Sequence, residues 1–223
     1  MKKHTWKIGI GIVLTSVLMA SPALGQEEAI QLVEDVSTIQ SFAQTPVAQE
    51  DIEKIVAAGI NSPSAVNQQP WHFSVVTDSA ILEEIAGGGA SSGDASDGGE
   101  SAEGESPDME GSSEGTTAIE KTDVADIPLA IVISCKTGSE FDAGLACQTM
   151  SIEAQLLGYG TKIVSSPTMV LNGKRQEEFR ELLNIPQDQS VAAVLMIGMP
   201  AEGYDAVSSA STRKPEQEIV SYH

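Results

Sequence analysis

The sequence predicts an α+β protein, a three-layer α/β/α sandwich in which a mixed sheet is flanked by helices. Helical segments alternate along the chain with short apolar runs of strand length, and this alternation is typical of a sheet covered by helices. The 223 residues are enough for one domain with a substantial core.

The periodicity of apolar residues places the elements of this domain. The segment 141–157 is apolar on most faces, so we expect a helix that lies in the core or against a second subunit. The segment 127–134 is continuously apolar, as strands covered on both faces are. Further helices are expected at residues 27–39, 45–60 and 174–183, and further strands at residues 72–78, 161–164 and 191–198.

Residues 1–25 resemble a secretory signal peptide. Lys2, Lys3 and Lys7 precede an apolar run, and small residues up to Gly25 are of the kind that a signal peptidase reads. Pro22 breaks the run, which makes it short for a membrane span. We therefore expect an exported protein of the extracellular or cell-envelope space, with its domain at residues 26–223. An uncleaved membrane anchor is the alternative.

Residues 87–117 interrupt this domain. The segment carries eight carboxylates, no cation and almost no large aliphatic side chain. It cannot bury enough apolar area to offset the entropy of ordering it. We predict a disordered, solvated insertion; a charged binding tail is the alternative.

The charge of the chain disfavours some partners. The formal net charge is −20, and loss of residues 1–25 would remove three lysines and take it to −23. Such a surface repels nucleic-acid phosphates and anionic lipid. Cys135 and Cys147 are the only cysteines; they either oxidise after export or serve as small buried side chains, and they do not suffice for a metal site.

The most informative stretch, Asn61 to Phe73, reads NSPSAVNQQPWHF. Pro70 lacks a backbone donor and biases Gln69 away from the helical region, so the chain must leave the turn extended at Trp71. An amide fixed in such a turn, here that of Asn67, can pair its donor and acceptor with the edge of a flat heterocycle.

With the helix expected before it, this turn resembles the PSxxNxQPW motif of the nitroreductase family of flavin enzymes. Residues 142–146 and 156–160 are similar to the family's central helix and the glycine-bounded turn after it. The resemblance covers residues 30–86 and 124–223 and implies a nitroreductase-like homodimer with FMN at the subunit interface.

The resemblance also assigns site residues. Asn67 matches the residue that meets the isoalloxazine edge, with Ser64 nearby; a turn-stabilising asparagine is the alternative. Ser165 and Ser166 match the loop whose backbone donors approach flavin N5; an ordinary polar turn before Pro167 is the alternative.

The residues expected to bind the FMN phosphate depart from the family pattern. Relatives commonly carry Arg-x-x-Arg where this chain has Ser37 and Gln40, so a phosphate of charge about −1.5 to −2 would be poorly compensated. Residues 205–214 resemble the acceptor sequence of exported flavoproteins to which a flavin transferase joins FMN through a phosphodiester. This implies covalent attachment at Ser211, with Arg213 left to meet the phosphate; a serine-rich loop is the alternative.

The sequence therefore predicts an exported, FMN-containing, nitroreductase-like oxidoreductase. It would pass electrons through flavin N5 from an unidentified donor to a small-molecule acceptor, and we expect the donor to be a membrane-bound or exported electron carrier. No catalytic proton-transferring side chain can be assigned. The alternative is a non-enzymatic module of the same fold, either a flavin-holding electron relay or a flavin-free binding protein.

Overall fold

The computed structural model describes residues 26–34, 36–87, 122–204 and 213–223. The predicted signal peptide, the predicted acidic insertion apart from its first residue, and Ser211 lie outside the described residues.

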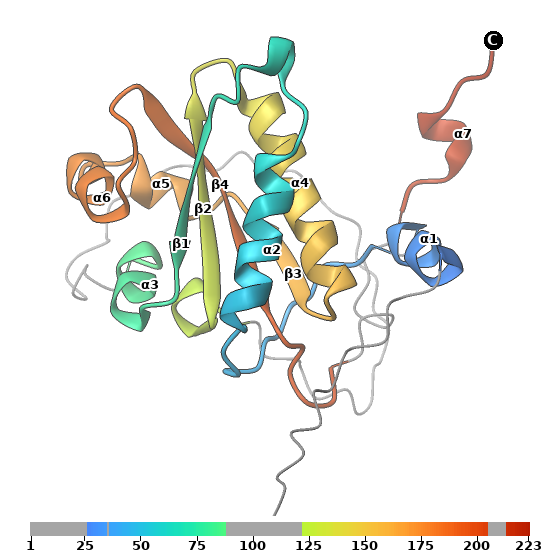
Figure 1. The fold of residues 1–223 in the computed structure, drawn as a ribbon, viewed down its shortest axis with the longest axis horizontal. Helices are drawn as coiled ribbons and strands as arrows, with labels where there is room; N and C mark the ends of the chain where they lie inside the picture. The colour runs from blue at the N-terminus through green and yellow to red at the C-terminus, as the bar shows by residue number, and fades with distance from the viewer. Residues whose placement is uncertain (1–25, 35, 88–121, 205–212) are drawn as a thin grey trace, which may run out of the picture.

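A four-stranded sheet forms the centre of the molecule (Figure 1). Its strands are β1 (Trp71–Val76), β2 (Leu129–Lys136), β3 (Gly160–Val164) and β4 (Gln189–Gly198), in the spatial order β1-β2-β4-β3. The three pairings among them are antiparallel, so the prediction of a mixed sheet was wrong for the described strands. A long helix does join β2 to β3, which point the same way, but β4 lies between them and runs against both.

Helices pack on the two faces of this sheet. The helices α2 (Gln49–Ile60) and α4 (Glu140–Leu156) share one core with alternate residues of β2, among them Ile131 and Ile133. The helices α3 (Ser79–Ile85), α5 (Thr168–Leu171) and α6 (Gln176–Leu183) share the other core with the residues in between, Ala130 and Val132. The strand β2 is therefore buried on both sides, as its continuous apolar sequence predicted.

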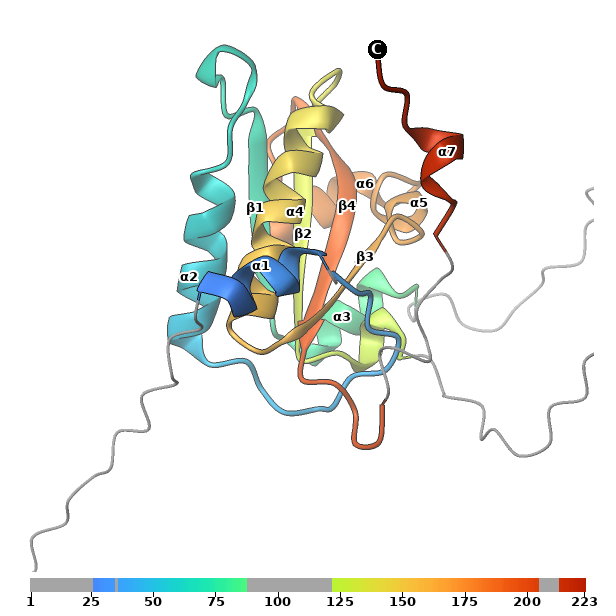
Figure 2. The same ribbon diagram turned by 90° about the vertical axis from the view of Figure 1, so that its right-hand side faces the viewer.

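The remaining elements are short. They are α1 (Gln26–Glu34), α7 (Glu216–Ile219) and the 3-10 turns η1 (Ala65–Asn67) and η2 (Val124–Asp126). Figures 1 and 2 both show α7 and the C-terminus beside the body of the molecule rather than on the sheet. None of the helices in the described ranges combines the length and the apolar character that crossing a membrane requires.

Several elements differ from the sequence predictions. The helix predicted at 45–60 begins only at Gln49, and the strands predicted at 72–78 and 127–134 are shifted by about two residues. The first helix ends at Glu34, before the predicted 39, because the chain then runs extended beside β3, where the Ile39 amide donates to the Thr161 carbonyl at 2.9 Å. The helix predicted at 174–183 begins only at Gln176 and follows the separate short helix α5. The helix α3 was not predicted; the Asp78 carboxylate caps it by accepting from the Ala80 amide at 2.9 Å.

The helices α2 and α4 lie unusually close together. A Cβ added to Gly59 on α2 would lie 2.7 Å from both Cγ and Sδ of Met150 on α4. The turn after α4 is tied to α2 as well, since the Tyr159 hydroxyl donates to the Asp51 carboxylate at 2.9 Å. These contacts fix α4 on the sheet, and both hollows described below lie against this helix.

Candidate functional site

The turn before β1 has a strained backbone. Val66, Asn67 and Gln69 have positive φ angles of 46°, 57° and 47°; for Val66, a β-branched residue, this conformation is costly. The Ser64 hydroxyl holds the turn closed by accepting from the Gln69 amide at 2.9 Å. Ser64 thus has a structural role in this chain.

The turn is anchored to the start of α4. The Ala65 amide donates to the buried carboxylate of Asp142 at 3.2 Å. The exposed Asn67 side chain accepts from the Gln69 amide group at 3.1 Å. Asn67 is therefore held in a turn, as predicted, with its amide at the surface.

Ser165 and Ser166 directly follow β3 and are exposed. Their carbonyls accept from the amides of Thr168 and Met169, at 3.0 and 3.3 Å, and so begin the turn that leads into α5. This bonding is that of an ordinary polar turn.

One copy of the chain does not bring the two predicted halves of the site together. The Asn67 turn precedes β1, the Ser165–Ser166 loop follows β3, and these strands form opposite edges of the sheet. Figure 2 shows α4 between the turn and β3. β1 begins beside the end of β2, where Trp71 pairs with Cys135, whereas β3 ends beside Val194, level with Val132 in the middle of β2.

A hollow of about 210 Å³, here called the α4 hollow, lies between α4 and the strands β2, β4 and β3. Small side chains leave this space open, among them Ala143 and Gly144 on α4 and Ala193 on β4. Ile163, two residues before Ser165, lines its side toward β3. The space is mostly apolar and adjoins the predicted N5 loop, which suits the flat face of an aromatic ring.

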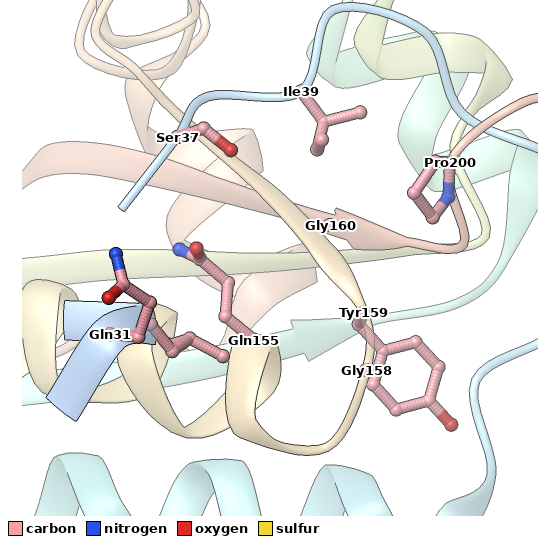
Figure 3. Close-up of a pocket in the computed structure, with 9 residues that line it drawn as sticks. Gln31, Ser37, Ile39, Gln155, Gly158, Tyr159, Gly160 and Pro200 are labelled. Carbon is pink, nitrogen blue, oxygen red and sulfur yellow. The ribbon is translucent and has the colours of Figure 1, made fainter. Parts of the chain in front are cut away.

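A second hollow, here called the Gln155 hollow, lies at the other end of β3 and measures about 480 Å³ (Figure 3). Its lining residues are Gln31, Leu32, Ser37, Ile39, Gln155, Gly158, Tyr159, Gly160 and Pro200. Ser37, which the resemblance matched to an arginine of the family pattern, is among them, whereas the Gln40 backbone amide donates to the Tyr204 hydroxyl at 3.1 Å.

The Gln155 side chain is held in place by a buried pair of hydroxyl groups. The hydroxyls of Ser151 and Thr161 lie 2.7 Å apart, and Gln155 Nε2 donates to them at 3.3 and 2.9 Å respectively. Sequence analysis did not find this cluster. Its signal was the presence of Ser151 and Gln155, four residues apart, in a helix that is otherwise largely apolar.

Both cysteines are buried, and no disulfide joins them. Burial raises the pKa of the Cys147 thiol to about 12, and burial with the nearby carboxylate of Glu140 raises that of Cys135. Cys147 lines the α4 hollow and is a neutral thiol there at ordinary pH. Within the described ranges, no cluster of His, Cys, Asp and Glu side chains could hold a metal ion.

The C-terminal basic residues lie in the last described segment. Arg213 and Lys214 are exposed, and the stretch that joins them to Tyr204, with Ser211, is outside the described residues. The predicted meeting of Arg213 with a phosphate is therefore a proposal.

The sequence of this chain matches that of a known protein family. The sequence model of the nitroreductase family matches residues 37–199. The chain belongs to the nitroreductase family. It is an oxidoreductase of that family, and the resemblance drawn from the turn at Asn67 is confirmed at this level.

Individual relatives agree with this assignment. The FMN reductase (NAD(P)H) of Bacillus subtilis is 28% identical over 197 residues, which are 86% of this chain and 72% of the relative. A nitroreductase with bound FMN from Bacteroides fragilis has a similar fold, with a TM-score of 0.64, 18% identity, and coverage of 88% of this chain and 98% of its own. A nitroreductase with bound FMN from Desulfitobacterium hafniense also gives a TM-score of 0.64 at 18% identity, covering 87% and 97% of the two chains.

Proposed function

We propose that this nitroreductase-family protein is an FMN-dependent oxidoreductase whose flavin ring lies in the α4 hollow. The observation that carries the proposal is that hollow itself, an apolar space floored by small side chains and adjoining the Ser165–Ser166 loop. The FMN named in the relatives from Bacillus, Bacteroides and Desulfitobacterium supports it. When bound, FMN supplies the redox chemistry at N5, while the protein supplies binding and orientation.

The residues of this chain would hold the ring in three ways. Ile133 and Ile163 exclude water from its apolar face. The backbone of the Ser165–Ser166 loop offers donors near N5. The Asn67 amide pairs with the polar edge of the ring and fixes its orientation.

We propose that the working unit is a homodimer in which the Asn67 turn of one copy meets the Ser165–Ser166 loop of the other. One chain leaves these halves at opposite edges of its sheet, so a second copy is needed to complete the site. Large apolar side chains are exposed near both halves: Val66 is 87% exposed, Phe141 78% and Met169 81%. Apolar groups of this size favour burial in an interface.

The two electron transfers would use the same ring in succession, with the donor product leaving before the acceptor binds. We propose export through residues 1–25, and hence a membrane-bound or exported electron donor, because soluble nicotinamide cofactors are scarce outside the cytoplasm. The acceptor is a small molecule.

We also propose that a flavin transferase attaches the FMN to Ser211 by a phosphodiester. The acceptor-like sequence at 205–212 and the neighbouring Arg213 and Lys214 support attachment. A phosphodiester carries one negative charge where a free FMN phosphate carries nearly two, so attachment lowers the need for the cations that Ser37 and Gln40 do not supply. Mass spectrometry of the tryptic peptide containing Ser211, after production with a flavin transferase, should show the mass of FMN less water. Release of all flavin on denaturation of that material would refute attachment.

The ring site can be tested by filling the α4 hollow. Nothing lies within 4 Å of a Cβ at Gly144, so Gly144→Leu should fold normally and lower the affinity for FMN at least tenfold in a fluorescence titration. Glu181→Leu, on the exposed side of α6, is the matched control and should bind like the wild type. Unchanged FMN affinity in Gly144→Leu, with normal circular dichroism, would exclude the α4 hollow. A wild-type protein that binds no flavin would favour the flavin-free alternative.

A further inference from the structure

The lining of the Gln155 hollow is uncharged throughout. Each of its nine residues is neutral at pH 7, although one residue in five of the whole chain is charged. Its polar side chains are the amides of Gln31 and Gln155 and the hydroxyl of Ser37, which Figure 3 shows with their polar ends gathered on one side of the space, and the Tyr159 phenol, which donates to Asp51 instead. Gln155 Nε2 already donates to Ser151 and Thr161, which leaves its Oε1 to accept from a ligand hydroxyl. The Ser37 hydroxyl can both donate and accept, and such groups match the hydroxyls of a polyol.

The neighbouring cation on β3, Lys162, is not among the residues that line this hollow, and it projects away from α4. Thr161 faces α4, because its hydroxyl bonds to Ser151, and Ile163 on the same face lines the α4 hollow. Side chains alternate along a strand, so Lys162 between them projects to the opposite face of the sheet. Its partner in the register, Met196, belongs to the core on that opposite face.

The two hollows both lie against α4 and along β3, a short distance apart: Gln148 lines the α4 hollow, and Gln155, two helical turns further on, lines the other. Gly160 lines the Gln155 hollow and Ile163 lines the α4 hollow. Three residues of strand separate them by roughly 10 Å. A flavin whose ring occupies the α4 hollow would extend its ribityl tail along β3 toward the Gln155 hollow.

We propose that the Gln155 hollow binds the flavin tail as a neutral or singly charged group, so that the protein without attached flavin binds riboflavin at least as tightly as FMN. This inference rests on the proposed flavin site. A doubly charged phosphate would lose water in the hollow and gain no charge-assisted bond from its lining. The net charge of −20 would add long-range repulsion. Riboflavin and a phosphodiester-linked flavin avoid most of this cost.

The test is a fluorescence titration of flavin-free protein, made without a flavin transferase, with riboflavin and with FMN at low and high salt. We expect riboflavin to bind with an equal or smaller Kd. We also expect FMN binding to strengthen with salt, which screens like-charge repulsion, while riboflavin binding changes little. FMN binding that is tenfold tighter than riboflavin binding and weakens with salt would overturn the inference and leave the proposed function intact. Saturable binding of neither flavin would overturn both.

A variant that adds a positive charge tests whether the preference for riboflavin over FMN arises in the Gln155 hollow. Ser37→Arg places a cation in the lining of the hollow and should tighten FMN binding at least tenfold relative to riboflavin. Gln187→Arg adds the same charge at an exposed position between α6 and β4, and should leave the ratio of the two Kd values near that of the wild type. Equal changes in both variants would mean that net charge alone, and not the Gln155 hollow, sets the preference.

Discussion

Two glycines in the packed helices α2 and α4 should respond in opposite directions to the same added methyl group. At Gly59 the new Cβ would lie 2.7 Å from Cγ and Sδ of Met150, closer than real Cβ contacts occur, so either the fully buried Met150 side chain or the helices themselves would have to shift. Overpacking of this kind typically costs about 1–3 kcal/mol. Alanine in place of glycine inside a helix returns about 0.5–1 kcal/mol. Overpacking therefore dominates, and Gly59→Ala should lower the free energy of unfolding by about 1–2 kcal/mol.

At Gly144 only the stabilising effect of replacing a helical glycine by alanine applies. No heavy atom lies within 4 Å of a Cβ there, and the position is exposed within α4. Gly144→Ala should raise the free energy of unfolding of the flavin-free protein by about 0.5–1 kcal/mol. The two variants should differ in midpoint temperature by roughly 3–12 °C, since 1 kcal/mol shifts a domain of this size by about 2–4 °C.

The assay is thermal and urea unfolding of both variants beside the wild type, followed by circular dichroism at one protein concentration. A fixed concentration matters because a dimer gains stability by mass action. Stabilisation of Gly59→Ala equal to that of Gly144→Ala would show that α2 and α4 do not pack as closely as described.

Three further predictions concern single polar side chains on or beside α4. The pKa of Cys147 is about 12 in the folded protein against 9.0 for the unperturbed thiol, so the stability it confers is present below about pH 9 and is lost as the pH rises toward 12. Cys147→Ala should therefore lose less free energy of unfolding than the wild type between pH 7 and about pH 10.5 in urea titrations; an equal loss would contradict the pKa. Thr161→Val removes the hydroxyl that bonds Ser151 and Gln155 and should cost about 1–3 kcal/mol, whereas the exposed Thr77→Val should cost less than about 0.5 kcal/mol; similar costs in urea unfolding would rule out the buried pair. The bonds from Lys54 and Tyr159 hold the pKa of Asp51 below its usual range. The ionised Asp51 carboxylate therefore stabilises the folded protein above about pH 4, and this contribution is lost as the pH falls. The difference in unfolding free energy between Tyr159→Phe and the wild type should accordingly shrink at low pH. A difference that does not change with pH would show that the Tyr159 hydroxyl does not stabilise the Asp51 carboxylate.

The sequence by itself determined the local structure around the site. Pro70 and the pattern of residues 61–73 gave the turn and the strand after it, because proline acts on its own and the preceding backbone. The long apolar segment gave α4 to within one residue at each end, since the periodicity of a helix is a local property. The motif of the turn was also enough to indicate the family.

Only the tertiary structure decided how these pieces meet. The insertion of β4 between β2 and β3 made the described sheet antiparallel, and no residue of α4 or β3 encodes that order by itself. The same order placed Asn67 and Ser165 at opposite edges, so one chain cannot complete the site that the motif predicts.

The two hollows, like the order of the strands, were decided by the tertiary structure. Their walls come from segments far apart in the sequence, such as Ser37, Gln155 and Pro200 for one of them. Whether each residue there faces solvent, core or ligand depends on strand order and on the approach of α4 to the sheet. The missing cation at Ser37 could be read from the sequence, whereas the uncharged space around it exists only once distant segments pack together.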